Sequence, residues 1–176
     1  TPDAWCMQSM SAHDSLLSVT WLDDINFSPG KHLLNTYYNP LKNSFTTPKI
    51  IAANDSMIET PSVALLPSKR SLITWSQSTL NESSIDTNLM SMDSVMQTHN
   101  IWFSICDTNQ IYGRWKLLNN TTAESEPNVH WGPSNKGIIT WERGDPVNGG
   151  NDIYFTEVTE NGINYPVHIG NLAVRC

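Results

Sequence analysis

The sequence predicts an all-β fold made of three tandem four-stranded antiparallel units. Two observations support this prediction. One segment occurs twice at a fixed register, and short β-branched and aromatic runs alternate with turn residues along the whole chain. No window of a dozen residues keeps a helical period. The 176 residues are expected to form one domain, 1–176, with repeat units 1–59, 60–125 and 126–176.

The internal repeat is the clearest signal. Glu59–Trp75 aligns with Ser125–Trp141 without a gap, and seven of the seventeen positions are identical. The second half of the unit repeats as well when Ile101 is set over Ile153. Self-similarity at such a period is typical of repeat architectures, in which each unit packs against its neighbours.

A more divergent copy comes first. Thr1-Pro2 is placed over Thr60-Pro61, Ser15–Trp21 matches the segment that ends at Trp75, and Leu33–Tyr38 takes the place of the third strand. Asn171–Cys176 resembles the first strand of a fourth unit. In this alignment Cys6 and Cys176 both take the register of Leu65.

Each unit is expected to contain four strands. A proline begins the first strand, because proline has no N–H for the centre of a ladder. A Pro-Ser turn leads to the second strand, which ends in Thr-Trp. Alternation then places Trp21, Trp75 and Trp141 on one face, where we expect them to pack between units. Strand three is expected at 101–106 and 153–158, strand four at 112–117 and 165–169, and an irregular insertion or short helix at 78–97.

Units of this kind are typical of β-propeller blades. Glu126–Trp141, followed by Asp152–Gly162, resembles the TolB-type, WD-like β-propeller repeat. That repeat has a proline, a Ser-Pro-Asp-Gly-Lys turn, an apolar strand and an Ile-Tyr strand that closes with glycine. The turn here reads Pro-Ser-Asn-Lys-Gly. The resemblance implies the propeller fold, and a fainter similarity to the sialidase Asp-box occurs at Ser134–Trp141.

Three blades cannot close a ring, because propellers contain about four to eight. The sequence therefore predicts an incomplete ring. The remaining blades would come from a longer propeller, from a second copy of the chain or from another protein partner.

Composition excludes some partners. The net charge is −7, and the 10 Lys and Arg residues form no basic run, so we expect no nucleic-acid binding. No apolar run is long enough for a membrane span. Several N-glycosylation sequons favour an extracellular or cell-surface location. They begin at Asn26, Asn54, Asn81, Asn119 and Asn120.

Two groups of residues are candidates for ligand binding. Flat aromatic faces suit the C–H surfaces of sugars, so tryptophans that the repeat does not explain could bind carbohydrate. The repeat leaves Trp5, Trp102, Trp115 and Trp131 unexplained, and the candidates are Trp102, Trp115 and Trp131. The acidic and amide-rich loop with Asp145, Asn148 and Asp152 could bind Ca²⁺, although a plain turn explains it equally. No other cofactor is expected.

Carboxylates that follow the second strands could hydrolyse glycosidic bonds if they converge within about 10 Å. They are Asp23, Asp24, Glu142 and Asp145, and solvated loop residues are the alternative. No Gly-x-Ser-x-Gly elbow accompanies the scattered histidines His13, His32, His99, His130 and His168. Cys6 and Cys176 could form a disulfide, and Cys106 is expected to be a buried thiol.

The sequence thus favours a non-enzymatic binding or structural module of an extracellular assembly, with its ligand surface on the loops between strands. Two alternatives stay open. The chain could be half of a catalytic propeller of the glycosidase or sialidase kind, or a filament or coat subunit that assembles by strand addition.

Overall fold

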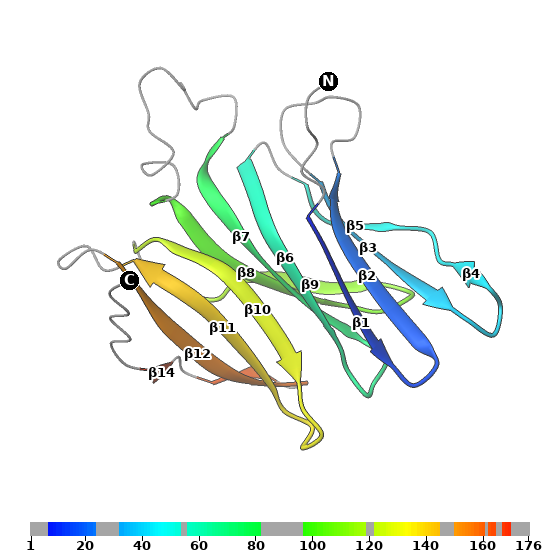
Figure 1. Cartoon of the computed structure of the whole chain (residues 1–176). Coiled ribbons are helices and arrows are strands. Elements are labelled where there is room, and N and C mark those ends of the chain that lie inside the picture. Colours follow the sequence, from blue (N-terminus) through cyan, green and yellow to red (C-terminus); the bar gives the residue numbers. More distant parts are fainter. Residues whose placement is uncertain are drawn as a thin grey trace.

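The computed structural model describes residues 7–23, 32–53, 56–81, 97–118, 122–144, 150–160, 162–164 and 167–169. These residues form three antiparallel sheets that stand side by side, and no helix occurs among them (Figure 1). The predicted all-β class is confirmed. The described part of the chain also contains no helix long and apolar enough to cross a membrane.

Each sheet is formed by consecutive strands. Sheet A contains β1 (Gln8–His13), β2 (Leu16–Asp23), β3 (His32–Asn39), β4 (Ser44–Phe45) and β5 (Lys49–Ala53). Sheet B contains β6 (Ser56–Leu65), β7 (Ser71–Asn81), β8 (His99–Cys106) and β9 (Ile111–Lys116). Sheet C contains β10 (Glu124–Trp131), β11 (Gly137–Gly144), β12 (Asn151–Thr159), β13 (Gly162–Ile163) and β14 (Val167–His168).

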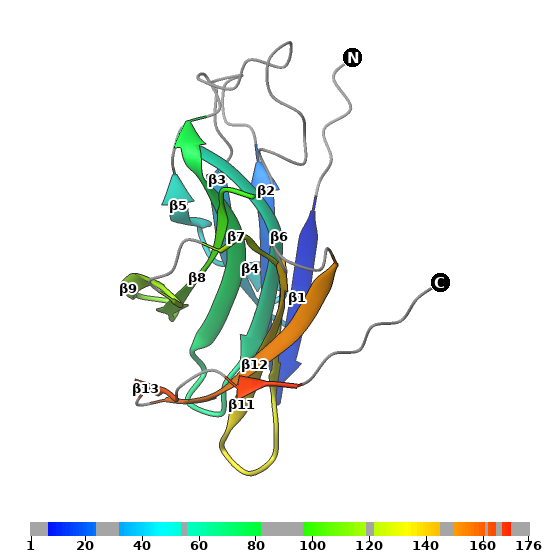
Figure 2. The same ribbon diagram turned by 90° about the vertical axis from the view of Figure 1, so that its left-hand side faces the viewer.

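The sheets are arranged like neighbouring blades. Their first strands β1, β6 and β10 contact one another in that order. In the view turned by 90°, β1 lies at one edge of the molecule, and β9 and β13 lie at the opposite edge (Figure 2). The first strands are therefore the inner strands of an open ring, as expected for three blades that do not close.

Strand pairing confirms the repeat in the second and third strands. Trp21 pairs with Leu34, Trp75 pairs with Trp102, and Trp141 pairs with Tyr154. The three tryptophans therefore occupy one position of the blade.

The predicted register of the first unit is wrong in its first strand. Met10 pairs with Val19 as Val63 pairs with Ile73. The residue equivalent to Leu65 is therefore Ala12 and not Cys6. The first strand of this unit shares few residues with the other two units. Its alignment therefore depended on one proline and gave the wrong register.

The expectation that a proline begins each first strand is also wrong. β6 runs through Pro61, and β10 runs through Pro127. Both prolines lie in β-bulges. The hydrogen-bond ladder is already interrupted there, so the missing backbone N–H of proline breaks no further hydrogen bond. The preceding residues, Thr60 and Glu126, have φ angles of 46° and 51°.

The fourth strand differs between the sheets. In sheet B it is the single strand β9, close to the predicted position. In sheet A both β4 and β5 pair with β3, and in sheet C both β13 and β14 pair with β12. The strand expected at 165–169 is thus replaced by two short pieces. The insertion expected at 78–97 begins as the end of β7, and residues 82–96 lie outside the described part.

Two hydrophobic clusters join the sheets. Trp75 is 0% exposed and packs between sheets A and B, whereas Trp141 is 1% exposed and packs between sheets B and C. Each tryptophan faces the preceding sheet. The expected packing between units is therefore confirmed for these two residues. Trp21 is partly exposed and no described sheet precedes sheet A, so for this residue the packing between units stays a prediction.

A buried polar network also joins sheets A and B. The Tyr37 hydroxyl donates to the Cys106 carbonyl at 2.9 Å. The Asn35 amide donates to Ser18 at 2.8 Å, and the Ser71 hydroxyl donates to Ser18 at 2.7 Å. Burial raises the pKa of the Cys106 thiol to about 11. As expected, Cys106 is a buried free thiol.

Replacing Trp75 with alanine should lower the free energy of unfolding by about 3–5 kcal/mol, because it leaves a cavity between two sheets. Urea denaturation measures this loss. Trp115→Ala serves as the control. Trp115 is 42% exposed, so its replacement should lower the free energy of unfolding by less. Equal losses in the two variants would contradict the assigned packing.

Stability should fall as the pH rises from 9 toward 11. The ordinary thiol pKa is 9.0, and the folded chain holds the Cys106 proton up to about 11, so the unfolded chain ionises first in this window. Cys106 alone contributes about 2–3 kcal/mol to this loss. Urea denaturation on both sides of the window should show a smaller loss in Cys106→Ala. The loss that remains would come partly from Tyr37, whose pKa burial also raises. An unchanged pH dependence in the variant would refute the assignment.

Candidate functional site

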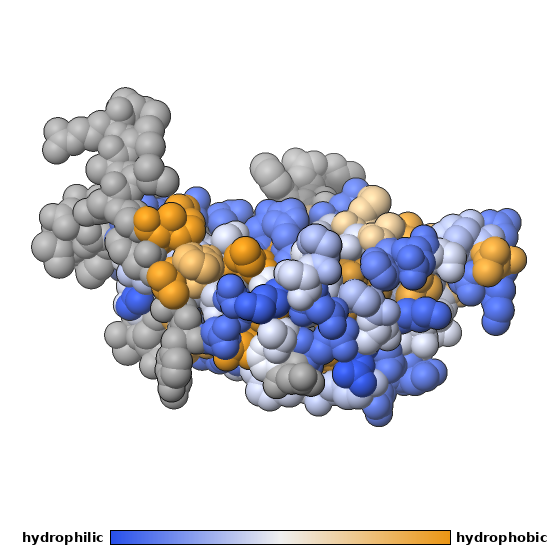
Figure 3. All heavy atoms as spheres, turned by 90° about the horizontal axis from the view of Figure 1, so that it is seen from below, coloured by the Kyte–Doolittle hydropathy of each residue, from blue (hydrophilic) through white to orange (hydrophobic). Residues whose placement is uncertain are grey.

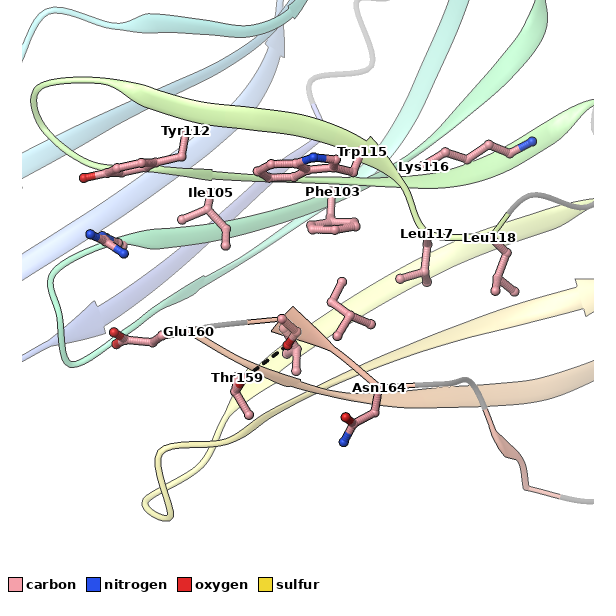
Figure 4. Close-up of a pocket in the computed structure, with 14 residues that line it drawn as sticks. Phe103, Ile105, Tyr112, Trp115, Lys116, Leu117, Leu118, Thr159, Glu160 and Asn164 are labelled. Atoms are coloured by element: carbon pink, nitrogen blue, oxygen red, sulfur yellow. Dashed lines mark hydrogen bonds between the residues drawn. The ribbon is translucent and has the colours of Figure 1, made fainter.

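A groove lies between sheets B and C (Figure 4). Its volume is about 700 Å³, within the usual range of small-molecule sites. One wall comes from β8 and β9, and the other comes from β12 and β13. Phe103, Ile105, Leu117, Leu118, Val158 and Ile163 form most of its apolar lining.

An aromatic ledge forms the β9 wall. Phe103 pairs with Trp115, and their rings stack with centroids 5.2 Å apart. Gly113 lies two residues before Trp115 on the same face of the strand. A Cβ atom at Gly113 would come within 2.3 Å of the Trp115 ring, so only glycine lets the indole lie against the strand. Trp115 nonetheless remains 42% exposed.

Tyr112 extends the ledge along the same strand (Figure 4). The Arg70 guanidinium lies 4.4 Å from the centre of its ring. The Tyr112 hydroxyl donates to Asp107 at 2.5 Å, and this hydrogen bond is the main reason why the pKa of Asp107 is lowered. The ring is thus held in place from two sides.

Polar groups line the edges of the groove. Arg70 and Lys116 come from sheet B or its turns, and Glu160 and Asn164 come from the opposite side. Glu160 accepts a hydrogen bond from the Ser68 backbone at 3.3 Å, which places its carboxylate at the mouth. The groove therefore combines aromatic faces, an apolar floor and hydrogen-bonding groups of both kinds.

A second cluster gathers carboxylates of sheets B and C. Partial desolvation raises the pKa of Glu126, and the charges of Glu142 and Glu59 raise it further. Glu142 accepts a hydrogen bond from Asn151 at 2.6 Å. Glu59 lies 3.6 Å from the ring of the fully buried His99.

Sequence reasoning identified Glu142 but missed its neighbours Glu59 and Glu126. Glu126 directly precedes Pro127 and Glu59 lies two residues before Pro61, so both lie at the bulges beside the repeated prolines, and that proximity was the available signal. Asp23 lies at the exposed end of β2 in sheet A, whereas Glu142 lies in sheet C. Asp24 and Asp145 lie outside the described residues, so their convergence stays a prediction.

The three candidate tryptophans lie on three different surfaces. Trp115 lines the groove. Trp102 faces sheet A, packs against the core and has Arg114 over its ring at 5.3 Å. Trp131 ends β10 and borders a hollow of about 520 Å³ along the inner strands.

The remaining candidates divide between described and undescribed segments. Among the described residues, no group of three His, Cys, Asp or Glu side chains could hold a metal ion. Asp152 is described, but Asp145 and Asn148 are not, so Ca²⁺ binding stays a prediction. The same holds for the Cys6–Cys176 disulfide, which lies outside the described part. Of the sequon asparagines, Asn81 is described and exposed, and Asn26, Asn54, Asn119 and Asn120 fall outside.

No protein-family model matches the chain, and no curated protein matches it. Solved structures do. An endo-arabinase from Bacteroides thetaiotaomicron VPI-5482 superposes with a TM-score of 0.55 at 10% identity, covering 97% of this chain and 65% of the enzyme. A GH93 alpha-L-arabinofuranosidase of Fusarium graminearum, solved with arabinobiose, superposes with a TM-score of 0.54 at 9% identity. This match covers 87% of this chain and 44% of that enzyme.

These matches show the fold alone. They confirm three β-propeller blades in a ring that is not closed. The chain spans less than two thirds of either matched protein. The TolB-type, WD-like assignment stays a prediction.

Proposed function

We propose that the chain is a carbohydrate-binding segment of a propeller, and that a short oligosaccharide binds in the groove between sheets B and C. The observation that supports this proposal is the ledge of Trp115 and Tyr112 beside polar groups at the mouth. A sugar ring offers the matching chemistry, because one face is lined by C–H groups and its rim by hydroxyls.

Each part of the groove has a role in this proposal. The exposed indole of Trp115 stacks on the sugar ring. Arg70 donates hydrogen bonds to hydroxyls, and Glu160 accepts them. Asn164 can do both. The apolar lining of the groove offers no hydrogen-bonding partner. The part of the ligand that contacts it must therefore be apolar, such as the C–H face of a sugar.

The structural neighbours suggest which sugars to test first. One is an endo-arabinase, and the other is an arabinofuranosidase solved with arabinobiose. Arabino-oligosaccharides are therefore the first probes. An extracellular location is part of the proposal, since the exposed Asn81 could bear a glycan at the end of β7 without disturbing the core.

Trp115→Ala should weaken the binding of arabino-oligosaccharides to the full-length protein about tenfold, because stacking contributes about 1 kcal/mol or more. Gly113→Ala should weaken it similarly by displacing the indole. Isothermal titration calorimetry measures both effects. Arg114→Ala is the matched control, since its side chain lies on the opposite face of the same strand. Equal affinity in Trp115→Ala and the parent, or no binding of any sugar in the panel, would refute the proposal.

Hydrolysis of a glycosidic bond is the second candidate. Glu126 has the raised pKa that a general acid needs, and Glu142 and Glu59 are carboxylates near it. Two carboxyl groups flanking the bond are the usual machinery of such enzymes.

If this second function is correct, Glu126→Gln should lower the hydrolysis of aryl arabinosides by the full-length protein about 10²–10⁴-fold. Release of the aryl group measures the rate. Glu160→Gln, a carboxylate of the groove, should affect the rate much less. Absence of hydrolysis in the parent protein, or full activity in Glu126→Gln, would exclude this mechanism and leave the binding proposal intact.

A further inference from the structure

We infer that the groove between sheets B and C binds the terminal unit of an oligosaccharide chain, and that Arg70 and Glu160 hold this unit. The inference rests on the proposed binding of carbohydrate and names the part of the chain that is recognised. Both side chains line the groove, Arg70 from sheet B and Glu160 from sheet C.

A contact between the two sheets crosses the mouth of the groove at one end. Ser68 lies between β6 and β7 in sheet B, and Glu160 directly follows β12 in sheet C. The Ser68 backbone N–H donates to the Glu160 carboxylate at 3.3 Å. A direct contact leaves no room for a sugar ring between the two groups. A chain that lies along the groove therefore ends here.

The turn that carries Ser68 is held by its own backbone. The Leu66 N–H donates to the Arg70 carbonyl at 2.8 Å, and the Lys69 N–H donates to the Leu66 carbonyl at 2.9 Å. Seen from below, the side of the molecule that carries this turn is mostly hydrophilic across its middle (Figure 3). The closed end thus presents polar groups from a fixed turn.

Arg70 stands at this end with its hydrogen-bonding groups unused. Its guanidinium lies 4.4 Å from the centre of the Tyr112 ring, and its side-chain N–H groups donate to none of the described residues. Stacking on a ring leaves the edge of a guanidinium free to donate. The Glu160 carboxylate has further lone pairs besides the one that Ser68 uses. A fixed donor and a fixed acceptor are therefore both available to a ligand here.

The rest of the groove has a different character. Figure 4 shows Tyr112 and Glu160 toward one end, Leu117 and Leu118 toward the other, and Trp115 between them. The groove is thus polar where it is closed and apolar along the remainder.

The terminal unit of a chain has the groups that the closed end can recognise. Each glycosidic bond uses one position of each ring that it joins, so a terminal unit keeps a hydroxyl that an internal unit lacks. This hydroxyl can accept a hydrogen bond from Arg70 and donate one to Glu160. Hydrogen bonds to charged groups are stronger than those between neutral groups. The following units would place their C–H faces on Trp115 and the apolar lining.

Isothermal titration calorimetry of the full-length protein with linear arabino-oligosaccharides of increasing length tests this inference. We expect one protein molecule per chain at every length, because only one end of the chain fits. Methylation of the hydroxyl at that end should weaken binding about tenfold or more, since it removes a hydrogen bond to a charged group. Methylation of the opposite end should leave the affinity nearly unchanged.

Variants of the two charged residues separate the closed end from the rest of the groove. Glu160→Ala removes the contact with Ser68, so the preference for a free chain end should largely disappear. Glu160→Gln keeps an oxygen that can accept from Ser68 and should keep most of the preference. Arg70→Met keeps an apolar stem over Tyr112 without the N–H donors and should lose it. Arg114→Ala, on the opposite face of β9, should keep the full preference.

The outcomes distinguish this inference from the proposal on which it rests. Several protein molecules per long chain, or equal binding of free and methylated chains, would overturn the inference and leave carbohydrate binding intact. An unchanged preference in Glu160→Ala would likewise overturn it. Absence of binding to every sugar would overturn both.

Discussion

Packing of a tryptophan from the second strand against the preceding sheet is the contact on which the rest of the structure depends. An indole of this kind buries about 150–250 Å² of surface, which corresponds to roughly 4–6 kcal/mol at 25 cal/mol per Å². Trp75 and Trp141 each supply one such contact. Their indole N–H groups are satisfied by Gln77 and Glu124, so burial leaves no donor unpaired. Two contacts of the same kind therefore fix the spacing and rotation of three sheets.

Both candidate sites follow from this spacing. Because blades diverge from the inner strands outward, their outer strands leave a groove where β9 stands apart from β13. Toward the other end, the bulges opposite the two tryptophans place Glu126 close to Glu59 and Glu142. The same two contacts thus separate an aromatic groove, suited to binding sugars, from a group of carboxylates, suited to proton transfer.

Much of the fold could be predicted from the sequence, because a repeat exposes strand registers that a single copy hides. The equivalence of Trp75 and Trp141 gave the second and third strands correctly. The short strands that replace a fourth strand in sheets A and C, of two to five residues, had no signal of their own, since strands this short depend on tertiary pairing. The groove between sheets B and C could not be predicted from the sequence either. Trp115 was identified as a candidate, but its neighbours come from a different sheet, and Gly113 matters only because an indole lies against it.

A crystal structure of the chain would test the central claim most directly. It should show three sheets stacked in the order A, B, C, with the indoles of Trp75 and Trp141 each enclosed by the preceding sheet. Sheets packed in another order, or either of these two indoles open to solvent, would contradict the account.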